Sequence, residues 1–310
     1  MNVVLAAEES AGLQMLRSLA HSHHRLVAVL AEPPKAGAAG GSVWNAAKEL
    51  GCETWPARSV QDPDLAKQLR SERVDILLNV HSLYILNNEV LKAPKLGAFN
   101  LHPGPLPRYA GLNAVSWAIF RGEQTYGVTV HKIEAGIDTG AIVYQSCFPI
   151  EKDETALSLS LKCVREGVKL MLQLLDAAGA HPDSIPLTPQ DTARREYFGR
   201  EVPEQGRISW SWPAQKIVNF VRACDYFPFS SPWGHPRSCL GVKEFALVKA
   251  QATGLVCEVS PGTVGKATDS GVYVACEDEW IVASKLHFGG KFVPAKEVLK
   301  LGDRLAECAS

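Results

Sequence analysis

The sequence has almost no excess of charge of either sign. It contains 32 basic and 33 acidic residues among 310, a formal net charge of −1, and no dense run of lysine and arginine. Binding to a nucleic acid or an anionic membrane depends on clustered positive charge. We therefore expect neither a nucleic acid nor a membrane as partner. With 46% hydrophobic and 21% charged residues, the composition is that of a globular protein.

Paired cysteines and long apolar runs are also missing. None of the eight cysteines forms a Cys-x-x-Cys pair, and several lie in apolar stretches such as Val256-Cys257 and Ala275-Cys276. This pattern favours buried free thiols over a zinc site or a disulfide framework. No apolar run approaches the length of a membrane span, and the first residues lack the basic and apolar regions of a signal peptide. We expect a cytoplasmic protein without a metal.

The length is sufficient for two domains, and the first, residues 1–180, alternates strand and helix patterns. Strands are predicted at 2–7, 25–31, 52–56, 74–79, 97–102, 127–132 and 140–147. Helices are predicted at 10–21, 42–50, 60–71, 87–93, 112–121 and 155–178, with Ser10, Ser42 and Thr155 as N-caps. The alternation predicts an α/β domain with a mostly parallel, Rossmann-like sheet.

The second part of the chain has a different pattern. Residues 181–206 are rich in Pro, Asp, Thr and Arg and are predicted to form a linker on the surface. From 207 to 310, a helix at 213–224 precedes short alternating runs at 243–250, 254–259, 271–276 and 279–285. Short strands separated by glycine-containing turns predict a small OB-like β-barrel.

Three polar residues stand out as a candidate reacting centre. Asn100 and His102 lie two apart at the end of the strand 97–102, so their side chains share one face at the carboxyl edge of the sheet. Asp138 lies between Gly136 and Gly140, in a loop between two predicted strands. An amide, an imidazole and a carboxylate can together run acyl transfer without a covalent intermediate. We expect His102 to be an exposed cleft residue close to Asp138.

These residues also carry a resemblance. The segments Phe99-Asn-Leu-His-Pro-Gly-Pro-Leu-Pro-Arg-Tyr-Ala-Gly111, Gly127-Val-Thr-Val-His131 and Gly136-Ile-Asp-Thr-Gly140 resemble the folate-dependent formyltransferases in order and spacing. Gly206-Arg-Ile-Ser-Trp210 and Pro261-Gly-Thr-Val264 are similar to the linker and C-terminal barrel of the larger members. One departure is Gly104-Pro105, where many of the members that act on tRNA carry Ser-Leu; sugar-modifying and peptide-synthetase members often have the present version.

The resemblance implies catalysis by Asn100, His102 and Asp138, with 10-formyltetrahydrofolate as the formyl donor and no metal. It implies that Asn100 and His102 stabilise an oxyanion, that His102 takes the proton of the attacking amine, and that Asp138 orients the imidazole. By the same analogy, the folate-contacting residues are Ile85, Leu86, Asn87, Pro105, Leu106, Gly111, Ile133 and Gly136.

The acceptor amine is open to several interpretations. A small molecule, above all a nucleotide-linked amino sugar, is favoured because the loop 32–42 carries a single lysine and the C-terminal region is not strongly basic. The alternatives are methionyl-tRNA and an amino acid in peptide natural-product synthesis. A third kind of protein, a ligand-binding module without catalysis, is disfavoured by the complete set of Asn100, His102 and Asp138.

Overall fold

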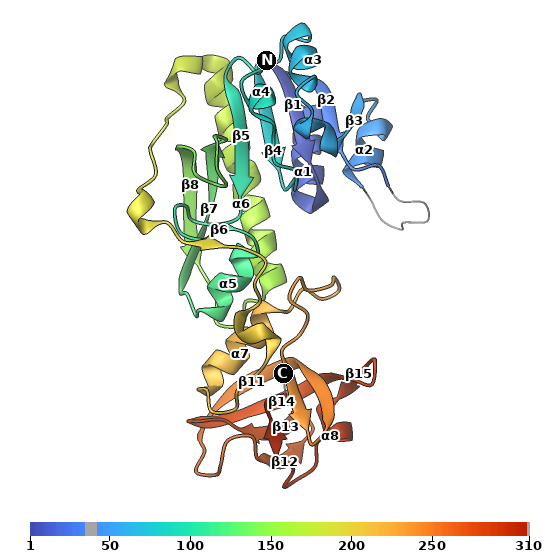
Figure 1. The fold of residues 1–310 in the computed structure, drawn as a ribbon, viewed down its shortest axis with the longest axis vertical. Coiled ribbons are helices and arrows are strands. Elements are labelled where there is room, and N and C mark those ends of the chain that lie inside the picture. Colours follow the sequence, from blue (N-terminus) through green and yellow to red (C-terminus); the bar gives the residue numbers. More distant parts are fainter. Residues whose placement is uncertain (35–41, 309–310) are drawn as a thin grey trace. The chain divides into compact units, whose positions relative to one another are not determined.

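The computed structural model describes residues 1–34 and 42–308 (Figure 1). By its contacts the chain divides into two compact units. The first unit contains residues 1–111, 126–148 and 161–197, and the second contains 112–125, 149–160 and 198–310. The segments 112–125 and 149–160 therefore belong with the C-terminal residues, although in the sequence they lie between segments of the first unit.

The first unit is built on a mostly parallel sheet, as the sequence predicts. Its strands are β1 (Asn2–Ala7), β2 (Arg25–Ala31), β3 (Thr54–Pro56), β4 (Ile76–Val80), β5 (Gly97–His102), β7 (Thr125–Lys132) and β8 (Ile142–Pro149), in the order β3-β2-β1-β4-β5-β7-β8. The pairings among β1 to β5 are parallel, and β7 runs antiparallel to β5. The order reverses between β1 and β4, which is where open α/β sheets leave room for ligands beyond the carboxyl ends of their strands.

Helices connect these strands close to their predicted positions. They are α1 (Glu9–Ala20), α2 (Val43–Glu49), α3 (Leu65–Ser71), α4 (Asn88–Leu91) and the long α6 (Ala156–Ala180). The predicted caps of α2 and α6 are confirmed, since Ser42 Oγ accepts the Asn45 N–H and Thr155 Oγ1 accepts the Ser158 N–H. Ser10 is not a cap: the left-handed backbone of Glu9 (φ 59°) starts α1 one residue earlier, with Glu8 at the N-cap.

The loop between β7 and β8 is held in a strained turn. Asp138 has a positive φ of 54° and lies between Gly136, with φ 106°, and Gly140. A Cβ on Gly140 would overlap the carbonyl oxygen of Lys132. Gln190 Nε2 donates to the carbonyl oxygens of Asp138 (3.0 Å) and Gly140 (2.7 Å). Part of the segment predicted as a linker thus fixes the backbone of this loop.

The second unit contains an antiparallel sheet. Its strands are β10 (Arg237–Leu240), β11 (Lys243–Val256), β12 (Val264–Thr268), β13 (Gly271–Ala275), β14 (Glu279–Phe288), β15 (Lys291–Pro294) and β16 (Leu305–Ala306), ordered β12-β13-β14-β11-β10-β16 with β15 beside β14. The two ends of this order meet, because Leu305 N donates to Gly262 O and Val264 N donates to Asp303 O. The helices α7 (Ala214–Ala223), α5 (Ala114–Phe120) and α8 (Ala295–Val298) belong to the same unit.

Two details of this unit correct the sequence interpretation. No separate strand covers 254–259 in the described chain, because β11 continues through irregular pairings with β14 as far as Val256. Cys239 and Cys308 form a disulfide, with their Cα atoms 5.2 Å apart, so two of the eight cysteines are not free thiols. The antiparallel pairing of β10 with β16 brings these residues together across a separation of 69 in the sequence, which a local pattern does not reveal.

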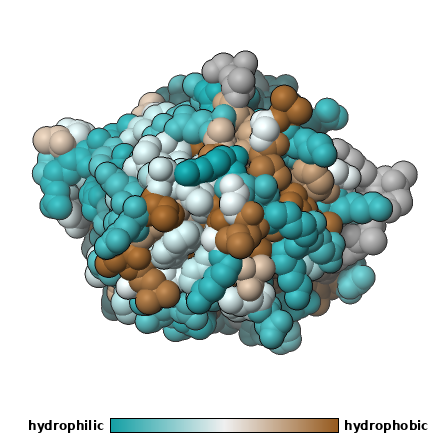
Figure 2. Space-filling view, turned by 90° about the horizontal axis from the view of Figure 1, so that it is seen from below, coloured by the Kyte–Doolittle hydropathy of each residue, from teal (hydrophilic) through white to brown (hydrophobic). Residues whose placement is uncertain are grey.

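Hydrophobic residues are scattered over the surface and do not make any described helix long and apolar enough for a membrane span. On the face drawn in Figure 2, hydrophobic residues form small patches surrounded by hydrophilic ones, as on most protein surfaces. None of the helices in the described part of the chain combines the length and apolar character needed to cross a membrane.

The packing around Gly140 generates a stability prediction. We expect Gly140→Ala to lower the free energy of unfolding by about 2 kcal/mol or more, because its methyl group meets rigid backbone. The matched control is Gly179→Ala in α6, where the nearest atoms to an added Cβ are 3.6 Å and 3.9 Å away. That substitution should be neutral or stabilise by up to about 1 kcal/mol, since alanine favours helix. Denaturant titrations measure both, and equal effects would contradict the assignment of the clash.

Candidate active site

The strand pairing of β5 with β7 brings two pairs of polar residues together. In the antiparallel register, Asn100 lies opposite His131 and His102 lies opposite Thr129. Side chains two residues apart on a strand project from the same face. The sequence pattern of alternating polar residues on both strands therefore produces one polar cluster at the end of β5.

Asn100 is held at both ends of its amide. Its Oδ1 accepts a hydrogen bond of 2.9 Å from Asn79 Nδ2, at the end of the neighbouring strand β4. Its Nδ2 lies 3.1 Å from His131 Nε2, and an amide nitrogen can only donate. One N–H of Asn100 is thus used by His131. The other N–H has no partner within the described residues, and Asn100 is only partly buried.

His102 lies between two acceptors. Its Nε2 is 2.7 Å from the carbonyl oxygen of Tyr109, to which it donates, and its Nδ1 is 3.4 Å from Asp138 Oδ2. The expectation of an exposed His102 is wrong: only 4% of the residue is accessible, because the loop after β5 folds back over it. Gly104 permits this close approach, since a Cβ there would lie 2.7 Å from His102 Nε2.

Asp138 joins the two imidazoles of the cluster. Its Oδ2 accepts the Gly111 N–H at 2.8 Å and faces His102, while its Oδ1 lies 3.3 Å from His131 Nε2. Burial by itself raises the pKa of Asp138, but His102, His131 and the Gly111 N–H outweigh it and hold the pKa far below its usual range. The carboxylate is therefore ionised throughout the physiological pH range.

Burial has the opposite consequence for His102. It lowers the pKa of the imidazole, while the Asp138 carboxylate and the Tyr109 carbonyl raise it without cancelling the effect of burial. His102 is thus a neutral imidazole at pH 7 that can take up a proton. A proton received on Nδ1 would be stabilised by the adjacent carboxylate.

His131, Thr129 and Asn79 belong to this cluster although they were not among the predicted site residues. Thr129 is fully buried; its Oγ1 donates to Gly104 O (2.7 Å) and accepts the Leu106 N–H (3.1 Å), which fixes the proline-rich loop after β5. The signal in the sequence is the polar alternation of Thr129 and His131, which matches that of Asn100 and His102. The sequence alone does not give the register that places these residues opposite one another on β5 and β7.

The residues predicted to contact folate differ in how available they are. Ile85 is 71% exposed, whereas Leu86 (7%) and Leu106 (3%) are buried, so the side chains of these two leucines pack within the protein. The Asn87 side chain caps α4 by accepting the Glu89 N–H, and the Gly111 N–H is used by Asp138.

The remaining three predicted folate residues lie in loops and are at least partly accessible. Pro105 and Ile133 are partly buried, and Ile133 packs against a core cluster that includes Leu86. Gly136 is exposed and turns the chain with a positive φ. These residues therefore offer backbone and partial side-chain surface.

Two buried polar atoms near Asn100 lack partners. Asn79 Oδ1 and Ser82 Oγ are inaccessible and form no hydrogen bond, while Leu83 and Ile85, which follow directly, are 83% and 71% exposed. Buried polar atoms are nearly always satisfied in a working protein. Leu83 and Ile85 thus offer an exposed apolar surface next to Asn79 and Ser82 in the chain. The described residues contain no group of three metal-ligating side chains.

The coupling between Asp138 and His102 generates a titration prediction. Asp138→Asn removes the negative charge that raises the His102 pKa, so the titration midpoint of the imidazole should move to lower pH. Side-chain NMR of the histidines measures the midpoint. Asp153→Asn, which removes an exposed carboxylate outside the cluster, should leave it in place. A midpoint that stays or rises in Asp138→Asn would refute the coupling.

Comparison with known proteins places this geometry in context. The formyl transferase model matches residues 1–175, and the model of the formyl transferase C-terminal domain matches residues 202–301. A methionyl-tRNA formyltransferase of Legionella pneumophila (strain Paris) is 27% identical over 312 residues, covering 97% of this chain and 96% of that protein.

Solved structures share the fold at lower identity. An N-formyltransferase from Helicobacter canadensis, in complex with folinic acid and dTDP-3-aminofucose, has a TM-score of 0.70 at 18% identity, covering 91% of this chain and 98% of that chain. HypX from Aquifex aeolicus, in complex with tetrahydrofolic acid, has a TM-score of 0.60 at 20% identity, covering 96% of this chain and 46% of that chain. With both family models matched in order along its length, this chain belongs to the formyl transferase family.

Proposed function

We propose that this enzyme transfers the formyl group of 10-formyltetrahydrofolate to the primary amine of a small molecule, a nucleotide-linked amino sugar. The observation that carries the proposal is the polar cluster at the end of β5. There, Asp138 lies within 3.4 Å of His102 and 3.3 Å of His131, and His131 contacts Asn100. An amide donor, a proton acceptor and an ionised carboxylate are thus held together in one buried network.

The residues near this cluster suit a folate. A pterin ring is flat, with hydrogen-bonding groups along its edge. The exposed Ile85 and the backbone around Gly136 can supply a surface for the ring. The bound folate would supply the formyl group. Stabilising the oxyanion and accepting the proton are left to the side chains of this protein.

The cluster divides the chemical work among three side chains. The unpartnered N–H of Asn100 can stabilise negative charge on the formyl oxygen, worth about 3–4 kcal/mol for a well-placed donor. His102 is neutral because burial lowers its pKa, so it can accept the proton that the amine loses and return it to the folate nitrogen that the formyl group leaves. Asp138 stabilises the imidazolium and fixes the orientation of the ring.

Charge favours a small acceptor over tRNA. Residues 207–310 contain twelve basic and ten acidic residues, and the whole chain has a net charge of −1. A tRNA ligand requires many cations along one surface. The loop 32–42, in which the sequence has a single lysine, lies largely outside the described residues, so its contribution is argued from composition alone.

The second candidate function is formylation of methionyl-tRNA. It is supported by the similarity to the Legionella methionyl-tRNA formyltransferase, which extends over 97% of this chain. Formylation of an amino acid in peptide natural-product synthesis would use the same cluster with a different acceptor. Measuring the rate of formyl transfer to each of the three acceptors distinguishes these functions.

His102→Asn tests the proposed chemistry. We expect kcat to fall by at least about 100-fold, because the proton acceptor is lost. Since His102 is buried, we also expect a loss of about 1–2 kcal/mol in stability, from its broken hydrogen bond to Tyr109. The exposed His23 provides the matched control, His23→Asn, which should keep full activity. Binding of tetrahydrofolate, followed by fluorescence, should persist in both variants; turnover retained in His102→Asn would exclude its role.

A panel of amines tests the acceptor. With 10-formyltetrahydrofolate as donor, nucleotide-linked amino sugars should show saturable turnover, and free amino acids and hydroxyornithine should not. Methionyl-tRNA should bind weakly, with an affinity that falls as salt rises. Efficient formylation of methionyl-tRNA at physiological salt, with the amino sugars ignored, would replace the proposal by the second candidate.

A further inference from the structure

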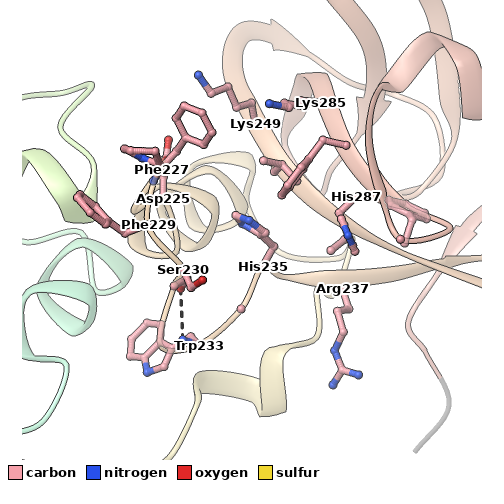
Figure 3. A pocket seen from close by; sticks show the side chains of 18 of the residues that line it. Asp225, Phe227, Phe229, Ser230, Trp233, His235, Arg237, Lys249, Lys285 and His287 are labelled. Atoms are coloured by element: carbon pink, nitrogen blue, oxygen red, sulfur yellow. Dashed lines mark hydrogen bonds between the residues drawn. The ribbon is translucent and has the colours of Figure 1, made fainter. Parts of the chain in front are cut away.

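The second unit contains a cleft of its own, of about 710 Å³ (Figure 3). Its lining comes from the segment 225–237, from the strands β11 and β14, and from the turn between β14 and β15. The volume lies within the range of sites that bind small molecules. None of its lining residues belongs to the unit that holds Asn100, His102 and Asp138.

Two lysines face each other across neighbouring strands in this cleft. Lys249 of β11 and Lys285 of β14 are register partners, and Figure 3 shows their ammonium groups on the same side of the cleft. Like charges directly opposite one another destabilise a sheet. Neither ammonium forms an ion pair with a described residue. An anion bound between them would remove the repulsion.

The acidic residues of the cleft are already engaged. Glu244 pairs with Arg237 at 3.4 Å, and Asp225 Oδ1 accepts the Phe227 N–H at 3.1 Å. Arg237 thus compensates the charge of Glu244, and with Lys249 and Lys285 the lining has three cationic side chains against two carboxylates.

Exposed aromatic rings stand beside the lysines. Phe227 and Phe292 are 67% and 54% exposed, and their ring centroids lie 5.4 Å and 5.0 Å from Lys285 Nζ. Phe229, also in the lining, is 69% exposed. Large apolar side chains grouped on a surface mark binding sites, and aromatic faces are suited to stacking on a flat ligand ring.

An unsatisfied imidazole completes the cleft. His235 Nδ1 is buried and forms no hydrogen bond, although the ring lies in the middle of the cleft (Figure 3). Burial lowers the pKa of His235, so the ring is neutral at pH 7 and one nitrogen can accept a hydrogen bond. A ligand with a polar group on its aromatic ring would satisfy this atom.

We propose that this cleft binds a nucleoside diphosphate group, with its phosphates between Lys249 and Lys285 and its base against Phe227 and Phe292. Two lysines match the two charged groups of a pyrophosphate, and the rings and His235 match a base. Its lining includes none of Asn100, His102 and Asp138, and the proposal does not depend on which amine accepts the formyl group. The nucleotide can be free or part of a larger metabolite, because both present the same groups.

Isothermal titration of the full-length protein tests the site. The probes are uridine diphosphate and adenosine diphosphate, with pyrophosphate and adenosine as the two halves of the ligand. We expect both diphosphates to bind and each half to bind at least about tenfold more weakly. If the site recognises only the nucleoside diphosphate group, a nucleotide sugar should bind as tightly as the free diphosphate. If the larger metabolite is the ligand, the nucleotide sugar should bind more tightly.

Matched variants assign the binding to this cleft. Lys249→Gln and Lys285→Gln should each raise the Kd for the diphosphates about tenfold, the effect of one lost charge-assisted contact. Phe292→Ala should raise it by a similar factor through lost stacking. The controls are Lys296→Gln and Leu301→Ala, which change exposed residues outside the lining and should leave Kd as it is.

Four outcomes would overturn the proposal. The first is that neither diphosphate binds, and the second is that Kd is unchanged in both lysine variants. The third is that pyrophosphate binds as tightly as the diphosphates, and the fourth is that only an RNA oligonucleotide binds. Diphosphate binding that survives both lysine substitutions would belong to another site. Formyl transfer by Lys249→Gln and Lys285→Gln is measured in parallel, so failure of the nucleotide site and failure of the proposed acceptor are distinguished.

Discussion

The buried carboxylate of Asp138 is the group on which the arrangement of the candidate active site depends. It contacts the imidazoles of His102 and His131 and accepts the Gly111 N–H. A charge removed from water is tolerated only when such partners replace the solvent. The same contacts therefore set the pKa of Asp138, orient both imidazoles, and tie the β7–β8 loop to the end of the proline-rich loop after β5.

The backbone around Asp138 shows how the protein maintains this contact. The residue lies in the left-handed region, a conformation that costs of order 1 kcal/mol or more outside glycine. Gln190 and Arg195 hold the loop by donating to its carbonyl oxygens. Local strain is thus offset by hydrogen bonds from residues about fifty positions later in the chain, and the carboxylate keeps a single orientation.

The candidate active site and the proposed nucleotide site differ in how their charged groups are compensated. The candidate active site holds its charge in a buried network, where one ionised carboxylate contacts two imidazoles. The cleft of the second unit holds two lysines without ion-pair partners in the described chain and surrounds them with exposed rings. A satisfied network favours precise proton transfer, whereas unsatisfied cations and open rings favour the binding of a ligand that supplies what is missing.

Much of the site was accessible from short patterns. The alternation Asn100-x-His102 at a strand end and Asp138 between two glycines predicted which polar groups lie together, because strand geometry and turn chemistry are local. The same segments, in their order and spacing, also indicated the family. The exposure of His102 was predicted wrongly, since it depends on how the loop after β5 folds back, with Gly104 and Thr129 holding it in place.

What the sequence by itself determined was the alternating strand and helix order, the polar residues at the carboxyl end of β5, and the turn at Asp138. Only the tertiary structure decided that His131 completes the cluster, that Cys239 reaches Cys308, and that Lys249 lies opposite Lys285. The physical reason is the same in each case. A strand's own residues fix which side chains share a face, but the register between strands depends on the packing of the whole sheet.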